Sequence, residues 1–283
     1  MKYSLTNKNS VTTALLLAAG TGSRLYPLTQ NAPKCLTIVN GKSILERMIE
    51  GLNLRGFKRL VIVTGHLEHK IKDYLGNQFQ NIQIEYIFSP LYKETNNIYS
   101  LWMARKTINE PFLLLESDLV YDDSLLDNML TPNKIAVAKM QPWLNGTCVI
   151  INNSLDVKAF IPGNDSDSSE IKYKTVNIYS ISQISWNLIV KRLDEQISKN
   201  NVNSYYETVF ADMVADGSLS FKAALFDNKP WYEIDNIEDL RVAEKIFNVA
   251  NYNISNPSIP SISKLLNDKR LGVIMPIPKV IRV

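Results

Sequence analysis

The stretch Leu16-Leu17-Ala18-Ala19-Gly20-Thr21-Gly22-Ser23-Arg24, with Pro33-Lys34 ending ten residues further on, decides the fold of this chain. The apolar run from Ala14 to Leu17 predicts a buried strand. Two glycines one residue apart allow the backbone to turn sharply, so that its N–H groups can face an anion. Arg24 and Lys34 supply the positive charge that a triphosphate and a leaving pyrophosphate need. The stretch therefore predicts a site for a nucleoside triphosphate.

Two common nucleotide-binding loops do not fit this stretch. A Walker loop ends in Gly-Lys-Ser/Thr, and a dinucleotide fingerprint needs a third glycine at the start of the helix. The glycine-rich stretch contains neither feature. The segment Gly41-Lys42-Ser43-Ile44-Leu45 comes later, after Pro33-Lys34, and extends the pattern. The pattern resembles the nucleotidyltransferases that join a nucleoside monophosphate to a phosphorylated metabolite, whose signature has the form L-A-A-G-x-G-x-R. The resemblance runs from about residue 14 to about residue 247.

That resemblance implies the sugar-nucleotidyltransferase fold, a Rossmann-like α/β fold with a mostly parallel mixed sheet, helices on both faces and a small acceptor-binding subdomain. In the family the glycine-rich signature binds the nucleotide. The residues of this chain that match it are Leu17, Ala18, Ala19, Gly20, Thr21 and Gly22. The family also places the base near the end of the next strand, where Gly65 is expected to contact it.

Length and composition set further bounds. The chain has 283 residues, 45% of them hydrophobic, and can bury a large core. A net charge of +3 is too small and too dispersed to indicate nucleic-acid binding. Cys35 and Cys148 are too few for a disulfide framework and lack metal-ligand spacing, which favours a reducing cytoplasm. No run approaches the roughly 18 apolar residues of a membrane span. We expect a cytoplasmic protein that binds neither nucleic acid nor membrane, and homodimer formation stays open.

Strand and helix patterns alternate along the chain, which predicts an α/β fold. We expect one nucleotidyltransferase domain over residues 12–250, with a mobile loop at 162–169. Residues 251–283 are expected to form a linker and tail, which docks on a partner subunit, leads to another domain or is a simple tail. Strands are expected at 14–17, 60–64, 82–88, 112–115, 134–140, 147–151, 156–161, 173–181 and 219–226, and helices at 44–52, 67–75, 125–129, 183–199, 203–216 and 237–247.

Two aspartates are candidates for a metal site. Asp118 follows an apolar strand, which places it at the ligand-binding edge of a parallel sheet. Asp235 directly precedes the last helix, which it could instead cap. The family resemblance implies that aspartates at these two positions hold Mg²⁺ against the α-phosphate, and carboxylate oxygens suit Mg²⁺. In the expected reaction a phosphate or phosphonate oxygen attacks the α-phosphorus directly, while Arg24 and Lys34 neutralise charge on the α-phosphate and on the leaving group.

One segment bears on the acceptor. Sugar-1-phosphate enzymes of the family carry a Gly-Thr motif where this chain has Thr95-Asn96-Asn97-Ile98-Tyr99-Ser100-Leu101. That segment resembles the phosphocholine and 2-aminoethylphosphonate cytidylyltransferases, and Tyr173-Lys174-Thr175-Val176-Asn177-Ile178-Tyr179 resembles the latter more. Both resemblances imply CTP as the nucleotide and a small zwitterionic acceptor. The alternatives are a sugar-1-phosphate nucleotidyltransferase and a catalytically idle nucleotide-binding module.

Individual side chains of the acceptor half have more than one interpretation. Lys174 contacts the phosphonate, or is a solvated lysine on an edge strand. Asn97 hydrogen-bonds the nucleotide or acceptor, or caps the helix that follows it. His66 and His69 lack a third ligand and are interpreted as surface residues. A cationic head group could lie against aromatic faces and a carboxylate, although most of these side chains are expected in the core: Trp143, Tyr173, Tyr179, Tyr205, Tyr206, Glu207 and Trp231.

Overall fold

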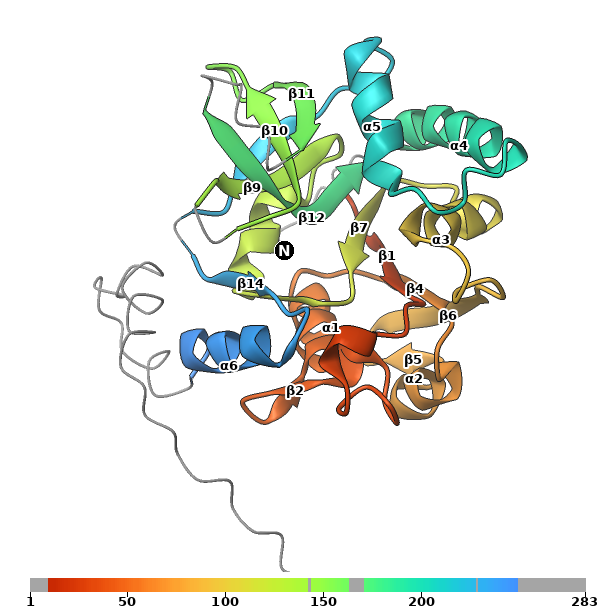
Figure 1. Ribbon diagram of the computed structural model, residues 1–283, viewed down its shortest axis with the longest axis vertical. Coiled ribbons are helices and arrows are strands. Elements are labelled where there is room, and N and C mark those ends of the chain that lie inside the picture. The colour runs from red at the N-terminus through yellow and green to blue at the C-terminus, as the bar shows by residue number, and fades with distance from the viewer. Residues whose placement is uncertain (1–9, 142–143, 163–170, 228, 249–283) are drawn as a thin grey trace, which may run out of the picture.

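The computed structural model describes residues 10–141, 144–162, 171–227 and 229–248. Within these ranges ten strands form one mixed sheet, and helices cover both of its faces (Figure 1). The strand order is β11-β10-β12-β7-β1-β4-β6-β5, with β9 paired to β12 and β13 paired to β9.

The first half of the chain builds a parallel sheet. Its central strand β1 (Thr13–Ala18) runs parallel to β4 (Arg59–Thr64) and to β7 (Phe112–Glu116), and β6 (Ile82–Phe88) extends it beyond β4. The loops after these strands therefore leave the sheet at one edge, which is where ligands bind in open α/β sheets. The glycine-rich stretch and Asp118 both follow strands of this set.

The second half extends the same sheet with mainly antiparallel strands. The long strand β12 (Lys172–Ile181) runs antiparallel to β7 and to two further strands, β9 (Lys134–Lys139) and β10 (Thr147–Ile151). Strand β11 (Val157–Pro162) pairs with β10, and β13 (Lys222–Leu225) lies parallel to β9. The half expected to receive the acceptor is thus continuous with the nucleotide half through β12.

Side chains of alternate residues divide the core between the two faces of the sheet. On β1, Leu16 packs on one face and Leu15 on the other. The face with Leu16 is covered by α1 (Ile44–Leu54), α2 (Glu68–Leu75) and α6 (Ile237–Ile246). The opposite face is covered by α3 (Asn97–Met103), α4 (Gln183–Ser198) and α5 (Tyr206–Ala215).

Short elements complete the described chain. Strand β14 (Trp231–Glu233) pairs antiparallel with β8 (Leu119–Tyr121), away from the main sheet. The remaining short strands are β2 (Ile38–Val39), β3 (Lys42–Ser43) and β5 (Gln78–Phe79), and 3₁₀ segments occupy Ser23–Leu25, Lys34–Leu36, Ala104–Lys106 and Asp123–Met129.

The predicted mixed α/β fold is confirmed, and each expected strand and helix is present with bounds that differ by at most three residues. The largest differences are at α5, which begins at Tyr206 instead of 203, and at β13, which begins at Lys222 instead of 219. Helix α5 starts late because the preceding segment hydrogen-bonds elsewhere: the carbonyl of Val202 accepts from the backbone N–H of Asn96 at 2.9 Å. The segment expected as a short helix at 125–129 is a 3₁₀ helix.

Several predictions lie outside the described residues. These are the loop at 162–169 apart from Pro162, the linker and tail at 251–283, and Trp143. Among the helices of the described ranges, none combines the length and the apolar character needed to cross a membrane.

Candidate active site

The loop after β1 offers exposed backbone at the carboxyl edge of the sheet. A Cβ added to Gly20 would meet no atom of the described chain within 4 Å, so a ligand can approach this backbone closely. Gly22 has a φ of +63°, which glycine adopts without strain, and an added Cβ there would lie 3.2 Å from the Cβ of Lys34. The Thr29 hydroxyl donates to the Gly22 carbonyl at 2.7 Å and holds the turn closed. Gly20 therefore leaves space for a ligand to approach the backbone, whereas Gly22 allows the positive φ of the turn.

The β8–β14 pair brings the two predicted metal aspartates together. Leu119 is paired with Glu233, and the backbone N–H of Ile234 donates to the carbonyl of Asp118 at 2.9 Å. Asp235 follows directly, at the start of the turn into α6. Its cap role falls instead to Asn236, whose side chain accepts from the N–H groups of Glu238 and Asp239. The capping alternative for Asp235 is therefore wrong.

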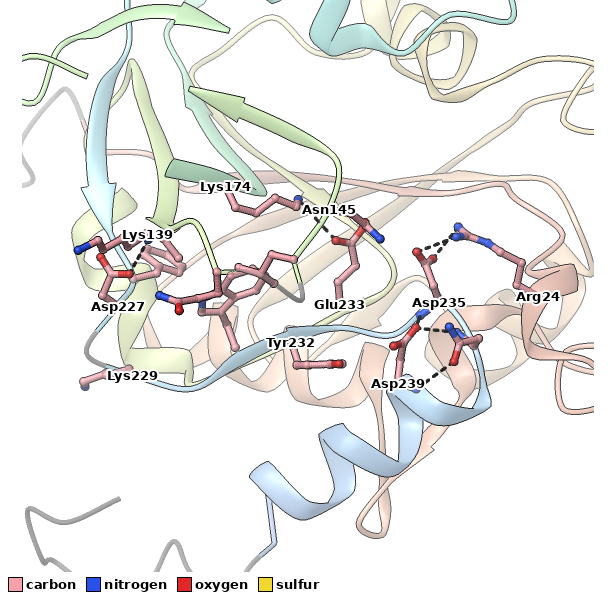
Figure 2. Close-up of a pocket in the computed structure, with 16 residues that line it drawn as sticks. Arg24, Lys139, Asn145, Lys174, Asp227, Lys229, Tyr232, Glu233, Asp235 and Asp239 are labelled. Carbon is pink, nitrogen blue, oxygen red and sulfur yellow. Dashed lines mark hydrogen bonds and ion pairs between the residues drawn. The ribbon is translucent and has the colours of Figure 1, made fainter. Parts of the chain in front are cut away.

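Four predicted side chains form one connected group at this edge. The Nζ of Lys34 lies 2.8 Å from Asp118 Oδ2 and 2.7 Å from Asp235 Oδ1. The guanidinium of Arg24 makes two hydrogen bonds to the carboxylate of Asp235, at 2.7 and 2.8 Å (Figure 2). Lys34 is 13% exposed and Arg24 is 70% exposed. Because exposed ion pairs contribute little stability, Arg24 can leave Asp235 for a ligand at small cost.

The charges of this group stabilise one another. Burial alone would lower the pKa of Lys34, but the adjacent carboxylates of Asp118 and Asp235 raise it, so the lysine is firmly protonated. Burial opposes ionisation of Asp235, yet Lys34 and Arg24 hold its pKa below the ordinary value. The site therefore presents two carboxylates that are paired with two basic side chains.

A third carboxylate, Glu233, completes a group that fits a divalent cation. Among the described residues, oxygens of Asp118, Glu233 and Asp235 lie within 4.8 Å of one another. The buried Asp118 Oδ1 has no hydrogen-bond partner within the described chain, which leaves it available as a ligand atom. Three carboxylates are hard oxygen donors of the type that Mg²⁺ takes. Glu233 was not assigned from the sequence, although its place two residues before Asp235 on an extended segment put both on one face.

Lys174 is buried next to this group. It is 3% exposed on β12, which pairs with strands on both sides, so the alternative of a solvated edge-strand lysine is wrong. Its Nζ donates to the Thr175 carbonyl at 2.6 Å and lies 3.6 Å from Glu233 Oε2. Figure 2 shows Lys174 and Glu233 pointing toward each other across the pocket. Burial raises the pKa of Glu233, and Lys174 counteracts that shift.

Two pockets lie in this part of the described structure, and Lys174 lines the first of them. The first has a volume of about 370 Å³ and is lined by Arg24, Lys139, Lys174, Glu233 and Asp235, among others (Figure 2). The second has a volume of about 730 Å³, and its lining includes Phe160, Tyr205, Glu207 and Asp212. Leu144 and Asn145 line both pockets. The pockets are therefore neighbours, with Glu233 and Asp235 of the carboxylate group lining the first and the buried carboxylate of Glu207 lining the second.

Glu207 is the buried carboxylate of the second pocket. It is 7% exposed, and its Oε2 has no hydrogen-bond partner among the described residues. Burial raises the pKa of Glu207 to about 7, although its own backbone N–H and the charge of Lys174 favour the ionised form. A desolvated carboxylate with a free oxygen is a site for a donor that carries positive charge.

The remaining predicted contacts lie around these pockets. The capping alternative for Asn97 at α3 is wrong, because Asn96 holds the cap position there and accepts from the Asn97 N–H at 2.8 Å. An added Cβ on Gly65 would lie 2.5 Å from the Ala19 carbonyl oxygen, which places Gly65 against the glycine-rich loop. His69 is exposed, and His66 is half-buried with its Nε2 3.2 Å from the Thr29 carbonyl. Nucleotide contacts of Asn97, Gly65 and residues 17–22 stay predictions.

Most of the aromatic candidates belong to the core, as expected. Tyr179 and Tyr206 are fully buried and pack edge to face with ring centroids 5.8 Å apart. Trp231 is also buried, and Tyr173 packs against the core. Tyr205 is 58% exposed and lines the second pocket.

Comparison with known proteins identifies the chain's relatives. Residues 13–153 match the family model for nucleotidyl transferases. The chain is 29% identical over 241 residues to CMP-5'-(3-aminopropyl)phosphonate synthase of Streptomyces rubellomurinus, covering 82% of this chain and 38% of that longer protein. It is 26% identical over 245 residues to choline-phosphate cytidylyltransferase of Streptococcus pneumoniae, covering 84% of this chain and 99% of the relative.

Solved structures show the same fold. The CTP:phosphocholine cytidylyltransferase of Streptococcus pneumoniae superposes with a TM-score of 0.74 at 24% identity, covering 84% of this chain and all of that one. A UDP-glucose pyrophosphorylase complexed with UDP-glucose superposes with a TM-score of 0.70 at 17% identity, covering 86% of this chain and 98% of that one. The structure thus has the nucleotide-diphospho-sugar transferase fold. Through residues 13–153 the chain belongs to the nucleotidyl transferase family.

Proposed function

We propose that this protein is a CTP-dependent cytidylyltransferase that transfers CMP to a small phosphonate or phosphate acceptor and releases pyrophosphate. The observation that carries the proposal is the convergence of Arg24, Lys34, Asp118 and Asp235 beside the glycine-rich loop, although up to 211 positions separate them. The choice of CTP is supported by relatives named as a CMP-phosphonate synthase and as cytidylyltransferases.

The chain's own groups fit direct transfer. An acceptor oxygen attacks the α-phosphorus, the new O–P bond forms, and the bond to the bridging oxygen breaks with its electron pair leaving on pyrophosphate. Because the attacking phosphonate oxygen is already ionised, the step needs no protein nucleophile or base. Lys34 and Arg24 neutralise charge on the α-phosphate and leaving group, and the loop at Gly20 receives the phosphates. Mg²⁺ held by Asp118, Asp235 and Glu233 would supply further charge neutralisation at the α-phosphate.

The two pockets support a zwitterionic acceptor. Its anionic end fits the first pocket, near Lys174 and the carboxylate group, and its cationic end fits the second pocket, at Glu207. The unpartnered Oε2 of Glu207 needs a hydrogen-bond donor, which a primary ammonium provides and a quaternary ammonium does not. We therefore favour 2-aminoethylphosphonate or a similar aminoalkyl phosphonate over phosphocholine.

Two other functions are less well supported. A sugar-1-phosphate nucleotidyltransferase is disfavoured because the chain has Thr95-Asn96-Asn97 at the place of the Gly-Thr motif. The likeness to UDP-glucose pyrophosphorylase, at 17% identity, bears on the fold alone. An idle nucleotide-binding module is disfavoured because it would not need two carboxylates paired with two basic side chains.

Pyrophosphate release tests the proposal. The purified protein, with Mg²⁺, is given each of the four NTPs in turn with 2-aminoethylphosphonate, phosphocholine or a sugar 1-phosphate. We expect release with CTP and the aminophosphonate. Asp118→Asn should lower kcat by about 100-fold or more while CTP binding falls much less, because the Asp118 carboxylate would hold Mg²⁺ at the reacting phosphate.

Asp127→Asn is the matched control for this assay, because Asp127 is 61% exposed and pairs with Arg55 away from the pocket. It should leave turnover unchanged. Release with a sugar phosphate would instead favour the sugar-1-phosphate alternative, and full turnover of Asp118→Asn would exclude the proposed role of Asp118.

A further inference from the structure

Asn97 occupies a junction between distant parts of the site. Its amide Nδ2 donates to Glu116 Oε1 at 3.0 Å, and its Oδ1 accepts from the backbone N–H of Tyr206 at 3.0 Å. Glu116 ends β7, two residues before Asp118, and Tyr206 begins α5, one residue before Glu207. One side chain therefore joins the strand that leads to the metal-type carboxylates with the helix that carries the carboxylate of the second pocket.

Helix α5 depends on this contact for its first turn. The first N–H groups of a helix have no partner within it and are usually satisfied by a side chain at the N-cap. Within the described chain, Tyr205 at the N-cap of α5 makes no side-chain cap hydrogen bond. Asn97, 109 residues earlier in the sequence, accepts from the first of these N–H groups instead. It acts as a cap supplied by another element, which fixes the start of α5 against α3.

The side chain of Asn97 is free for this role because its neighbour caps α3. Asn96 accepts from the Asn97 N–H at 2.8 Å, its own backbone N–H donates to the Val202 carbonyl, and its Nδ2 lies 3.5 Å from the Asn203 carbonyl. Asn96 thus joins the start of α3 to residues 202–203, and none of its described hydrogen bonds is to Glu116 or to α5.

We propose that Asn97 is a positioning residue for the acceptor, which sets the separation between Glu207 and the carboxylate group at Asp118, and is not a ligand of the nucleotide. This inference rests on the proposed function. If the acceptor's phosphonate lies at the Asp118 end and its ammonium at Glu207, that separation determines the length of acceptor that reaches both. Asn97 then influences acceptor choice without contacting the acceptor.

The test compares acceptors of two lengths, 2-aminoethylphosphonate and 3-aminopropylphosphonate, in the wild type and in Asn97→Ala. For each, kcat/KM with saturating CTP and Mg²⁺ gives a length preference, and titration calorimetry gives the Kd for CTP. We expect a clear preference in the wild type, a loss of about 10-fold or more of that preference in Asn97→Ala, and a CTP Kd within about twofold of wild type. Acceptor KM should change more than kcat.

Two further variants keep the test decisive. Asn97→Asp keeps an acceptor for the Tyr206 N–H but cannot donate to Glu116, so it should also lose the length preference, even if Asn97→Ala folds poorly. Asn96→Ala weakens the cap of α3 but leaves both contacts of Asn97, and should lower the melting temperature while the preference is retained.

Three results would overturn the inference: a weaker CTP Kd in the Asn97 variants with the preference intact, no change in either quantity, or a wild type with no length preference. Failure of the proposed function looks different, because the wild type would then release no pyrophosphate from CTP with any amino acceptor.

Discussion

The protonation of Glu207 links the stability of this protein to its proposed function. Burial raises its pKa to about 7, from 4.5 in an unfolded chain, against the opposing charge of Lys174. The carboxyls of Glu116 and Glu233 face the same region, and burial raises their pKa values as well. The folded protein therefore binds protons more tightly than the unfolded chain does between these two pH values.

This has a defined consequence for stability. The free energy of unfolding should fall as pH rises from about 5 to about 7, because the folded state gives up protons there that the unfolded chain has already lost. Glu207→Gln should reduce this slope without abolishing it, since Glu116 and Glu233 contribute to it too. Denaturant unfolding at several pH values measures the slope, and a steeper decline in Glu207→Gln than in wild type would contradict the assignment.

Activity should follow the opposite course. If the ionised Glu207 holds the acceptor's ammonium, kcat/KM for the aminophosphonate should rise with pH through about 7. Glu207→Gln should be slower at high pH and lack this rise. Asp212→Asn is the matched control, since Asp212 lies in the same helix and the same pocket but is exposed; it should keep the wild-type profile.

The sequence predicted the roles of some site residues and not of others. Arg24, Lys34 and Gly22 lie in one continuous motif whose chemistry is local, and the structure brings the two cations together with Asp118 and Asp235 as expected. Glu233 was not assigned, and Glu207 was named only as one carboxylate among the side chains of the acceptor half, because the significance of both depends on burial and on partners more than 25 positions away. No local pattern distinguishes such a carboxylate from one at the surface.

At the scale of elements, two turns meet after β1 and β4, and their glycines differ in what they require. Gly65→Ala would place a Cβ 2.5 Å from the Ala19 carbonyl and 2.7 Å from the Tyr92 ring, so it should lower the free energy of unfolding by about 1–3 kcal/mol. Gly20→Ala has open space and should leave stability nearly unchanged, yet weaken CTP binding by about 10-fold because the methyl group obstructs the phosphates.

Thermal melting and CTP titration of both variants check this pair. Each variant serves as the control for the other, because one is expected to change stability and the other affinity. If Gly20→Ala kept the wild-type CTP affinity, the glycine-rich loop would not be part of the nucleotide site. If Gly65→Ala kept the wild-type stability, this would contradict the close approach of Gly65 to Ala19.

Elements were predictable where periodicity is local. The strands at 147–151 and 173–181 and the helix at 183–199 follow from alternation and apolar spacing and are confirmed nearly to the residue. The pairing of β14 with β8 was not predicted, since each has three residues and their partnership spans more than 100 positions. That pairing is what brings Glu233 and Asp235 to Asp118.

At the scale of the whole molecule, the described core ends before the last 33 residues of the chain. Buried core side chains run from Val11 to Phe247. A chain of residues 10–250 should therefore keep the melting temperature within a few degrees and the CTP affinity of the full chain, because all of these buried core side chains lie within it. Thermal melting and titration measure both, and loss of CTP binding on truncation would show that residues 251–283 contribute to the site.

The overall arrangement was predictable in its first half and less so in its second. Parallel β-α units follow from alternating patterns along β1, α1, β4, α2 and β6, because neighbours in sequence are neighbours in space. The second half depends on β12, whose pairing with β7, β9 and β10 joins segments far apart in the chain. Nonlocal pairing of this kind leaves no periodic trace in a single sequence.

The ion pairs of Lys34 and Arg24 with Asp118 and Asp235 have a thermodynamic consequence. On the proposed function, CTP binding alone would draw the cations toward its phosphates and leave the aspartates uncompensated. Metal binding alone would engage the aspartates and leave the charges of Lys34 and Arg24 uncompensated. Each ligand therefore removes the penalty that the other incurs, and by linkage the two must bind with positive cooperativity, equal in size whichever arrives first.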